Sequence, residues 1–193
     1  MRNKKWKAEV FTIPNLLSVL RLVLIPVYMY FYINAREPWQ FHTAGAILTI
    51  SCLTDAIDGK IARHFHMVSV VGKILDPLAD KITQFSLILC LAFKYPVLKS
   101  VMLLFAMKET FQIVLGIIYL KQGKMLPGAI FAGKMCTAVL FVSLTVLVFF
   151  PNIHPNAVTA IALVDTTFLC ISFLGYCFAY LGRYKKVQNI KPE

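Results

Sequence analysis

Long apolar runs separated by short polar segments make up most of this chain. Each run is close to the roughly 20 residues that a helix needs to cross the hydrocarbon layer of a bilayer. The third run is the least regular, because Lys73, Asp76, Asp80 and Lys81 lie in its first half. The pattern predicts an all-α integral membrane protein with six transmembrane helices, at residues 13–34, 41–59, 70–94, 97–121, 130–150 and 156–182.

The composition agrees with this pattern. Hydrophobic residues make up 59% of the 193 positions and charged residues 15%, whereas soluble domains have about 45–50% and about 25%. No polar linker divides the chain, so we expect a single membrane domain over residues 1–193. The 5 cysteines lie singly in apolar runs, which argues against a disulfide framework or a zinc site.

The net charge of +11 bears on partners and orientation. The basic residues lie at the ends of apolar runs, which favours lipid headgroups and phosphate-bearing substrates over nucleic acid. The segments on one side of the predicted membrane hold 14 Lys and Arg, against 3 on the other. The positive side faces the cytoplasm, so we expect both termini there. The first run resembles a signal peptide, but it is long and interrupted by Asn15 and Arg21, so we expect a retained helix.

Four aspartates cluster around the link between the second and third predicted helices. Asp55 and Asp58 are three residues apart, and Asp76 and Asp80 are four apart, so each pair shares one helix face. A helical hairpin would bring the two faces together on the cytoplasmic side. Gly59 marks either a helix end or a place where another group approaches the backbone closely.

Carboxylates near lipid are costly, and such groups are functional candidates by default. One aspartate at the interface could simply be hydrated, but four on facing helices would repel each other without positive partners. Mg²⁺, which binds carboxylate and phosphate oxygens, would supply that charge. Arg63 offers a planar cation suited to phosphate. These residues predict a membrane enzyme that acts on a phosphate or pyrophosphate at the cytoplasmic face.

The segment resembles the signature of the CDP-alcohol phosphotransferase family, spaced Asp-x-x-Asp-Gly-x-x-Ala-Arg, eight residues, then Gly-x-x-x-Asp-x-x-x-Asp over residues 55–80. All eight defining positions are present. The stretch "IPNLLSVLRLVLIP" (13–26) resembles the first helix of the family. "LDPLADK" (75–81) and "GKMCTA" (133–138) resemble the subgroup that makes phosphatidylglycerophosphate and cardiolipin.

The resemblance implies a homodimer of six-helix protomers in a cell membrane, which we expect to be bacterial, with a polar cavity open to the cytoplasm. It implies Mg²⁺ or Mn²⁺, two ions being expected, on the carboxylates of Asp55, Asp58, Asp76 and Asp80. Asp80 would also be the general base. The residues implied to contact the CDP group are Asn15, Asp55, Gly59, Arg63 and Ser69.

The implied reaction transfers the phosphatidyl group of CDP-diacylglycerol to glycerol 3-phosphate, giving phosphatidylglycerophosphate and CMP. Phosphatidylglycerol as acceptor, giving cardiolipin, is the nearest alternative. A cation transporter whose aspartates line an ion path is an alternative of another class, although the chain shows no internal repeat of the kind many transporters have.

A phosphate-bearing acceptor needs further cations, and three residues are candidates. Lys134 lies in "GKMCTA" and could instead be an interfacial anchor. Lys108 lies within an apolar run beside Glu109 and could instead form a salt bridge with it. Arg21 could face the cavity or extend to the membrane surface. The family often has Arg-Glu-Phe where this chain has Lys108-Glu109-Thr110-Phe111, so the identity of the acceptor is less firmly implied than the reaction class.

Overall fold

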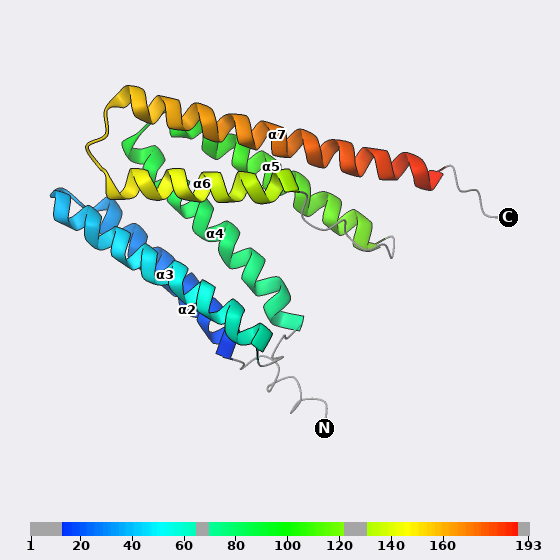
Figure 1. Ribbon diagram of the computed structural model, residues 1–193, viewed down its shortest axis with the longest axis horizontal. Coiled ribbons are helices and arrows are strands. Elements are labelled where there is room, and N and C mark those ends of the chain that lie inside the picture. The colour runs from blue at the N-terminus through cyan, green and yellow to red at the C-terminus, as the bar shows by residue number, and fades with distance from the viewer. Residues whose placement is uncertain (1–12, 65–69, 122–130, 189–193) are drawn as a thin grey trace. The chain divides into compact units, whose positions relative to one another are not determined.

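The computed structural model describes residues 13–64, 70–121 and 131–188, and the side chains of residues 15–54, 78–118 and 131–179. These residues form helices and no strand, which confirms the all-α prediction. Each helix overlaps one predicted range, and α3 and α7 extend beyond theirs (Figure 1). The helices are α2 (Ile13–Ile33), α3 (Pro38–His64), α4 (Val70–Lys94), α5 (Leu98–Lys121), α6 (Phe131–Phe149) and α7 (Pro155–Gln188).

Two of the helices begin at a proline, and a side chain next to each start binds the free backbone N–H groups. In α3, the backbone N–H of Glu37 donates to Gln40 Oε1 at 3.0 Å. This is the pairing of a capping box, in which a residue of the first turn reaches back to the cap. In α7, the N–H of Asn156 donates to His154 Nδ1 at 3.2 Å. These contacts fix where both helices start.

Within the described residues, four helices contain a stretch long and apolar enough to cross a membrane. This finding supports the prediction of a membrane protein. That α3 and α4 also span the bilayer stays a prediction. The four stretches are Asn15–Ile33, Leu98–Ile118, Phe131–Phe149 and Pro155–Ala179.

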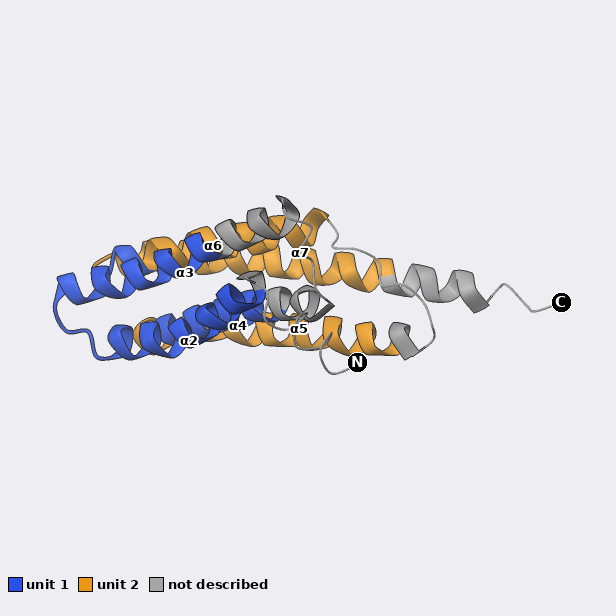
Figure 2. Cartoon of the chain, turned by 90° about the horizontal axis from the view of Figure 1, so that it is seen from below, with its two compact units in different colours: residues 1–91, 148–151 blue, residues 92–147, 152–193 orange. Residues whose placement is uncertain are grey.

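The chain divides into two compact units, coloured separately in Figure 2. Unit 1 comprises residues 1–91 and 148–151, and unit 2 comprises residues 92–147 and 152–193. Unit 1 therefore contains α2, α3 and most of α4. Unit 2 contains α5, most of α6, and α7.

In unit 1, aromatic rings and a glycine allow close packing. The rings of Tyr32 in α2 and Phe41 in α3 meet edge to face, with centroids 5.3 Å apart. Gly45 lies one turn further along α3, and a Cβ there would be 2.9 Å from the ring of Phe149. A larger residue at position 45 would displace that ring, so the glycine is needed for the close contact.

In unit 2, the buried face of α7 follows a regular spacing of four and three residues. This spacing keeps side chains on one side of a helix. α7 packs against α5, where the rings of Phe111 and Phe173 are 5.1 Å apart. The stripe contains two polar positions that the hydrophobic pattern alone does not explain. Its residues are Val158, Ala162, Asp165, Leu169, Ser172 and Tyr176.

Asp165 is the most enclosed carboxyl among the described residues, with 0% of its surface exposed. The hydroxyl of Ser143 in α6 lies 2.7 Å from its Oδ1 and 2.8 Å from its Oδ2. The same hydroxyl is 3.0 Å from the carbonyl oxygen of Leu140. A polar group buried without a hydrogen bond is costly, so this contact stabilises the packing of α6 on α7.

We predict that Ser143→Ala and Asp165→Ala each lower the melting temperature, through a loss of about 0.6–2 kcal/mol, the range for hydrogen bonds between membrane helices. Ser143→Ala should cost more than Asp165→Asn, whose side-chain amide can still pair with the hydroxyl. Thermal unfolding of detergent-purified protein measures both. Ser100→Ala, at an exposed serine that bonds the carbonyl of Val97, is the control. An Asp165→Ala protein as stable as the wild type would contradict the prediction.

Candidate active site

The signature positions lie on two consecutive helices. Asp55, Asp58, Gly59 and Arg63 belong to the last turns of α3. Gly72, Asp76 and Asp80 belong to α4. Because α3 continues to His64, Gly59 does not end it, and the alternative of a close approach to its backbone stays open. Ser69 lies outside the described residues, as do the side chains of positions 55–77.

Asp80 is the signature carboxylate whose side chain the structure describes. Its Oδ1 lies 2.6 Å from Nη1 of Arg21, which comes from α2. The two side chains are placed very differently, since 3% of the surface of the Arg21 side chain is exposed, against 50% for Asp80. The ion pair therefore joins an enclosed guanidinium to a carboxylate that can still be reached from outside unit 1.

Arg21 belongs to a polar stripe on the buried face of α2. Asn15, Ser18 and Arg21 are spaced by three residues and are at most 3% exposed. One turn further the stripe becomes apolar with Ile25 and Tyr28, which are also buried. The half of α2 that holds buried polar groups is thus the half that reaches Asp80. The structure places both Asn15 and Arg21 inside unit 1.

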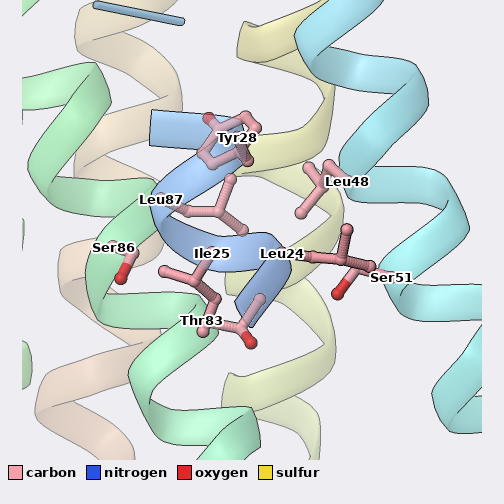
Figure 3. A pocket seen from close by; sticks show the side chains of 8 residues that line it. All are labelled: Leu24, Ile25, Tyr28, Leu48, Ser51, Thr83, Ser86 and Leu87. Carbon is pink, nitrogen blue, oxygen red and sulfur yellow. The ribbon is translucent and has the colours of Figure 1, made fainter. Parts of the chain in front are cut away.

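Mainly small and aliphatic side chains of α2, α3 and α4 meet in one layer (Figure 3). It surrounds a cavity of about 10 Å³, which is room for about one water molecule. Ser51 of α3 and Thr83 of α4 both line this space. Asp55 follows Ser51 by four residues and Asp80 precedes Thr83 by three. On both α3 and α4, a signature aspartate therefore lies about one helical turn from this layer. The lining residues are Leu24, Ile25, Tyr28, Leu48, Ser51, Thr83, Ser86 and Leu87.

Lys108 is enclosed in unit 2, with 2% of its surface exposed. Its Nζ lies 2.7 Å from Oε1 of Glu109 and 5.9 Å from the ring centroid of Tyr176. The salt bridge weighed as an alternative from the sequence is therefore present. A lysine at this distance from a phenol ring also gains cation–π attraction. Lys108 is held on the inside of its unit by two neighbours.

Tyr176 also explains the glycine of "GKMCTA". A Cβ at Gly133 would lie 2.5 Å from the Tyr176 hydroxyl oxygen and 3.0 Å from its ring. Gly133 therefore lets α6 come close to α7 at this level. The next residue, Lys134, is exposed, so it is available to a ligand or to lipid headgroups. Tyr176 contacts both neighbourhoods that the sequence marked for acceptor binding.

Sequence reasoning missed two polar groups of unit 2, Asp165 and Tyr176. A single aspartate in the middle of an apolar run is itself a functional signal, so Asp165 could have been noticed. Tyr176 carries no such signal, because aromatic residues are common in membrane helices. Within the residues that the structure describes, no three His, Cys, Asp or Glu gather as a metal site. Asp55, Asp58 and Asp76 are not among the side chains described.

Comparison with known proteins agrees with the sequence motif. A model of the CDP-alcohol phosphatidyltransferase family matches residues 11–176. A CDP-diacylglycerol–glycerol-3-phosphate 3-phosphatidyltransferase of Aquifex aeolicus is 35% identical over 136 residues, which cover 70% of this chain and 73% of that protein.

Two further relatives carry names that differ from each other. A probable phosphatidylglycerophosphate synthase of Mycobacterium tuberculosis is 29% identical over 171 residues, covering 88% of this chain and 80% of that protein. A cardiolipin synthase (CMP-forming) of Streptomyces coelicolor is 30% identical over 131 residues, covering 67% and 61%. An enzyme family, and not a transporter, thus accounts for the aspartate signature.

We predict that Gly133→Ala destabilises the protein by about 1–3 kcal/mol, the usual cost of overpacking a buried contact. The added methyl group would meet the enclosed Tyr176 side chain, so the melting temperature should fall. Gly175→Ala is the matched control, because a Cβ there has its nearest neighbour at 3.9 Å. Adding Tyr176→Phe to Gly133→Ala should restore part of the loss. Equal melting temperatures for Gly133→Ala and Gly175→Ala would contradict the packing described here.

Proposed function

We propose, on the premise that this chain belongs to the CDP-alcohol phosphatidyltransferase family, that it transfers the phosphatidyl group of CDP-diacylglycerol to glycerol 3-phosphate. The products are phosphatidylglycerophosphate and CMP. The observation that carries the proposal is the likeness to the Aquifex aeolicus enzyme, whose name states this reaction and of which the aligned region covers 73%. The complete signature at residues 55–80 and the apolar helices agree with it.

The donor set at the proposed site fits divalent cations. Four carboxylates on two consecutive helices offer the hard oxygen ligands that Mg²⁺ and Mn²⁺ take. Asp55, Asp58 and Asp76 would hold two such ions with the help of Asp80, whose half-exposed carboxylate can be reached by a ligand. When bound there, the cations offset the charge of the pyrophosphate and stabilise the attacking and leaving oxygens.

The signature residues bind the CDP group and hold the charge of the departing CMP. Arg63 suits phosphate oxygens because its guanidinium is planar and always charged. Gly59 lets the nucleotide approach the backbone of α3, where a side chain would intrude. Asn15 is buried on the polar stripe of α2. Asp55 and Ser69 complete the proposed contacts with the CDP group.

Asp80 accepts the proton of the attacking hydroxyl. The hydroxyl oxygen of the acceptor bonds to the β-phosphorus of CDP-diacylglycerol, and the bond from that phosphorus to the CMP oxygen breaks. A hydroxyl is a poor nucleophile until a positioned base takes its proton, and such a base contributes about 10²- to 10⁴-fold to the rate. The exposed half of the Asp80 side chain is where the acceptor would meet it.

The sequence suggests three cations as candidates for the phosphate of the acceptor. Lys134 is exposed at the start of α6. Lys108 would contribute from α5, although its ammonium already pairs with Glu109. Arg21 is the third, and its Nη1 already pairs with Asp80. Lys108 and Arg21 already form ion pairs. The exposed Lys134 is therefore the cation that can most readily bind the substrate phosphate.

The wider arrangement follows the same proposal. The protein would form a homodimer of single-domain protomers, each crossing the membrane six times, with the cavity and both termini on the cytoplasmic side. The excess of basic residues in the segments assigned to that side supports this orientation. CDP-diacylglycerol would enter from the bilayer and glycerol 3-phosphate from the cytoplasm.

Cardiolipin synthesis is the second candidate, because a relative from Streptomyces coelicolor carries that name. The chemistry would be the same, with a hydroxyl of phosphatidylglycerol as the attacking group. The two candidates differ in what the acceptor site must hold. Glycerol 3-phosphate brings a dianionic, fully soluble phosphate, whereas phosphatidylglycerol brings a phosphodiester and two acyl chains.

We predict that purified protein with Mg²⁺ or Mn²⁺ and CDP-diacylglycerol releases CMP when glycerol 3-phosphate is supplied, and not when only phosphatidylglycerol is supplied. Labelled CMP and the lipid product, measured together, give the reaction and its acceptor. EDTA should stop the release, and added Mg²⁺ should restore it. Asp80→Asn should reduce kcat by about 10²- to 10⁴-fold, the share expected of a general base, and leave CDP binding intact.

The outcomes separate the candidates. Product from phosphatidylglycerol, with none from glycerol 3-phosphate, would replace the proposed acceptor and keep the reaction class. No CMP release with either acceptor would reject the transferase. A matched control is Arg36→Gln, at an exposed arginine outside the proposed site, which should leave the rate unchanged.

A further inference from the structure

The two residues of the Arg21–Asp80 ion pair differ strongly in their exposure to solvent. The guanidinium comes from α2 and is enclosed, whereas the carboxylate comes from α4 and is half exposed. A surface ion pair, with both partners in water, contributes little. Here the cation is held by the packing of unit 1, and the anion is presented outward.

The enclosure of Arg21 limits what it can do. Its side chain is 3% exposed, and its Nη1 is 2.6 Å from Asp80 Oδ1. Pairing with a carboxylate offsets part of the cost of enclosing this charge, so the guanidinium favours contact with Asp80 while the carboxylate is ionised and ready to accept a proton. Its position is also fixed along α2, between the buried side chains of Ser18 and Ile25.

The carboxylate is held from one side by this contact. With Oδ1 bound to an enclosed guanidinium, rotation of the Asp80 carboxylate is restricted, and part of its surface stays open. Pre-organised groups of this kind raise rates because they need not be ordered during the reaction, and a misplacement of about 1 Å can cost about 10²-fold. The neighbouring turn of α4 is itself packed, with Ala79 at 0% and Thr83 at 7% exposed.

We propose that Arg21 is a positioning residue for Asp80, which orients the carboxylate that takes the proton of the acceptor. This inference rests on the proposed function, since it gives Asp80 the role of base. It differs from the assignment of Arg21 to the phosphate of the acceptor, because Arg21 then acts on the substrate only through Asp80. It also differs from a purely structural tie between α2 and α4.

The test compares wild type, Arg21→Gln, Asp80→Asn and the double variant, with Arg21→Lys as the conservative change. If Arg21 acts through Asp80, Arg21→Gln lowers kcat by about 10- to 100-fold, with KM for glycerol 3-phosphate within about threefold of wild type. Arg21→Lys should recover part of the rate, since it keeps the charge but loses the planar fork. The loss in the double variant should be no greater than that of Asp80→Asn alone, because residues that act as a unit are not additive.

Two results would overturn the proposal. One is an effect of Arg21→Gln that falls mainly on KM for glycerol 3-phosphate, which is the result expected of a residue that binds the acceptor. The other is a double variant whose loss equals the product of the two single losses, which would show that the residues act independently. Arg36→Gln serves as the control for removing an arginine.

Thermal unfolding of the same proteins tests the coupling of Arg21 and Asp80 independently of the proposed activity. If the residues are coupled as described, the double variant should melt higher than the sum of the two single shifts predicts. Additive shifts would reject the coupling, even in a protein that uses another acceptor. A coupled pair in a protein that releases no CMP would reject the proposed function. Should Arg21→Gln not fold, Arg21→Lys carries the same comparison.

Discussion

The cost of charge in a hydrophobic chain is the constraint on which this structure depends. Every ionised group removed from water needs a partner, and each buried charged or acidic side chain described here has one. Arg21 meets Asp80 at 2.6 Å, Lys108 meets Glu109 at 2.7 Å, and Asp165 meets the hydroxyl of Ser143. An unpaired buried charge would be strongly destabilising. The contacts that join different helices, Arg21 with Asp80 and Ser143 with Asp165, therefore restrict which helix faces can pack together within each unit.

The two units use this constraint differently. In unit 2 both partners of each polar contact are largely enclosed. The contacts of Lys108 with Tyr176 and of Asp165 with Ser143 therefore stabilise the packing of α5, α6 and α7. In unit 1 one partner is enclosed and the other is exposed, which makes the pair available for chemistry. The proposed transferase needs a carboxylate that is both ordered and accessible, and Asp80 is the described carboxylate that combines a buried partner with half of its surface open.

The sequence was sufficient to predict the helices, because they depend on local spacing. Runs of apolar residues predicted six helices, and the spacing of the aspartates placed each pair on one face. Contacts between distant positions could not be predicted in this way. Arg21 and Asp80 are 59 positions apart and Ser143 and Asp165 are 22 apart, and their pairing depends on how each helix is rotated about its axis. Tyr176 was missed because an aromatic residue is common in a membrane helix and gives no functional signal of its own.

The proposed function requires the aspartates of α3 and α4 to bind divalent cations beside the pyrophosphate of the donor lipid. A crystal structure of the protein with Mn²⁺ and CDP-diacylglycerol, using the anomalous scattering of manganese, tests it most directly. We expect manganese bound by the carboxylates of Asp55, Asp58 and Asp76, next to the pyrophosphate and near Asp80. Pyrophosphate bound with manganese at a different place, or with none at these carboxylates, would contradict it.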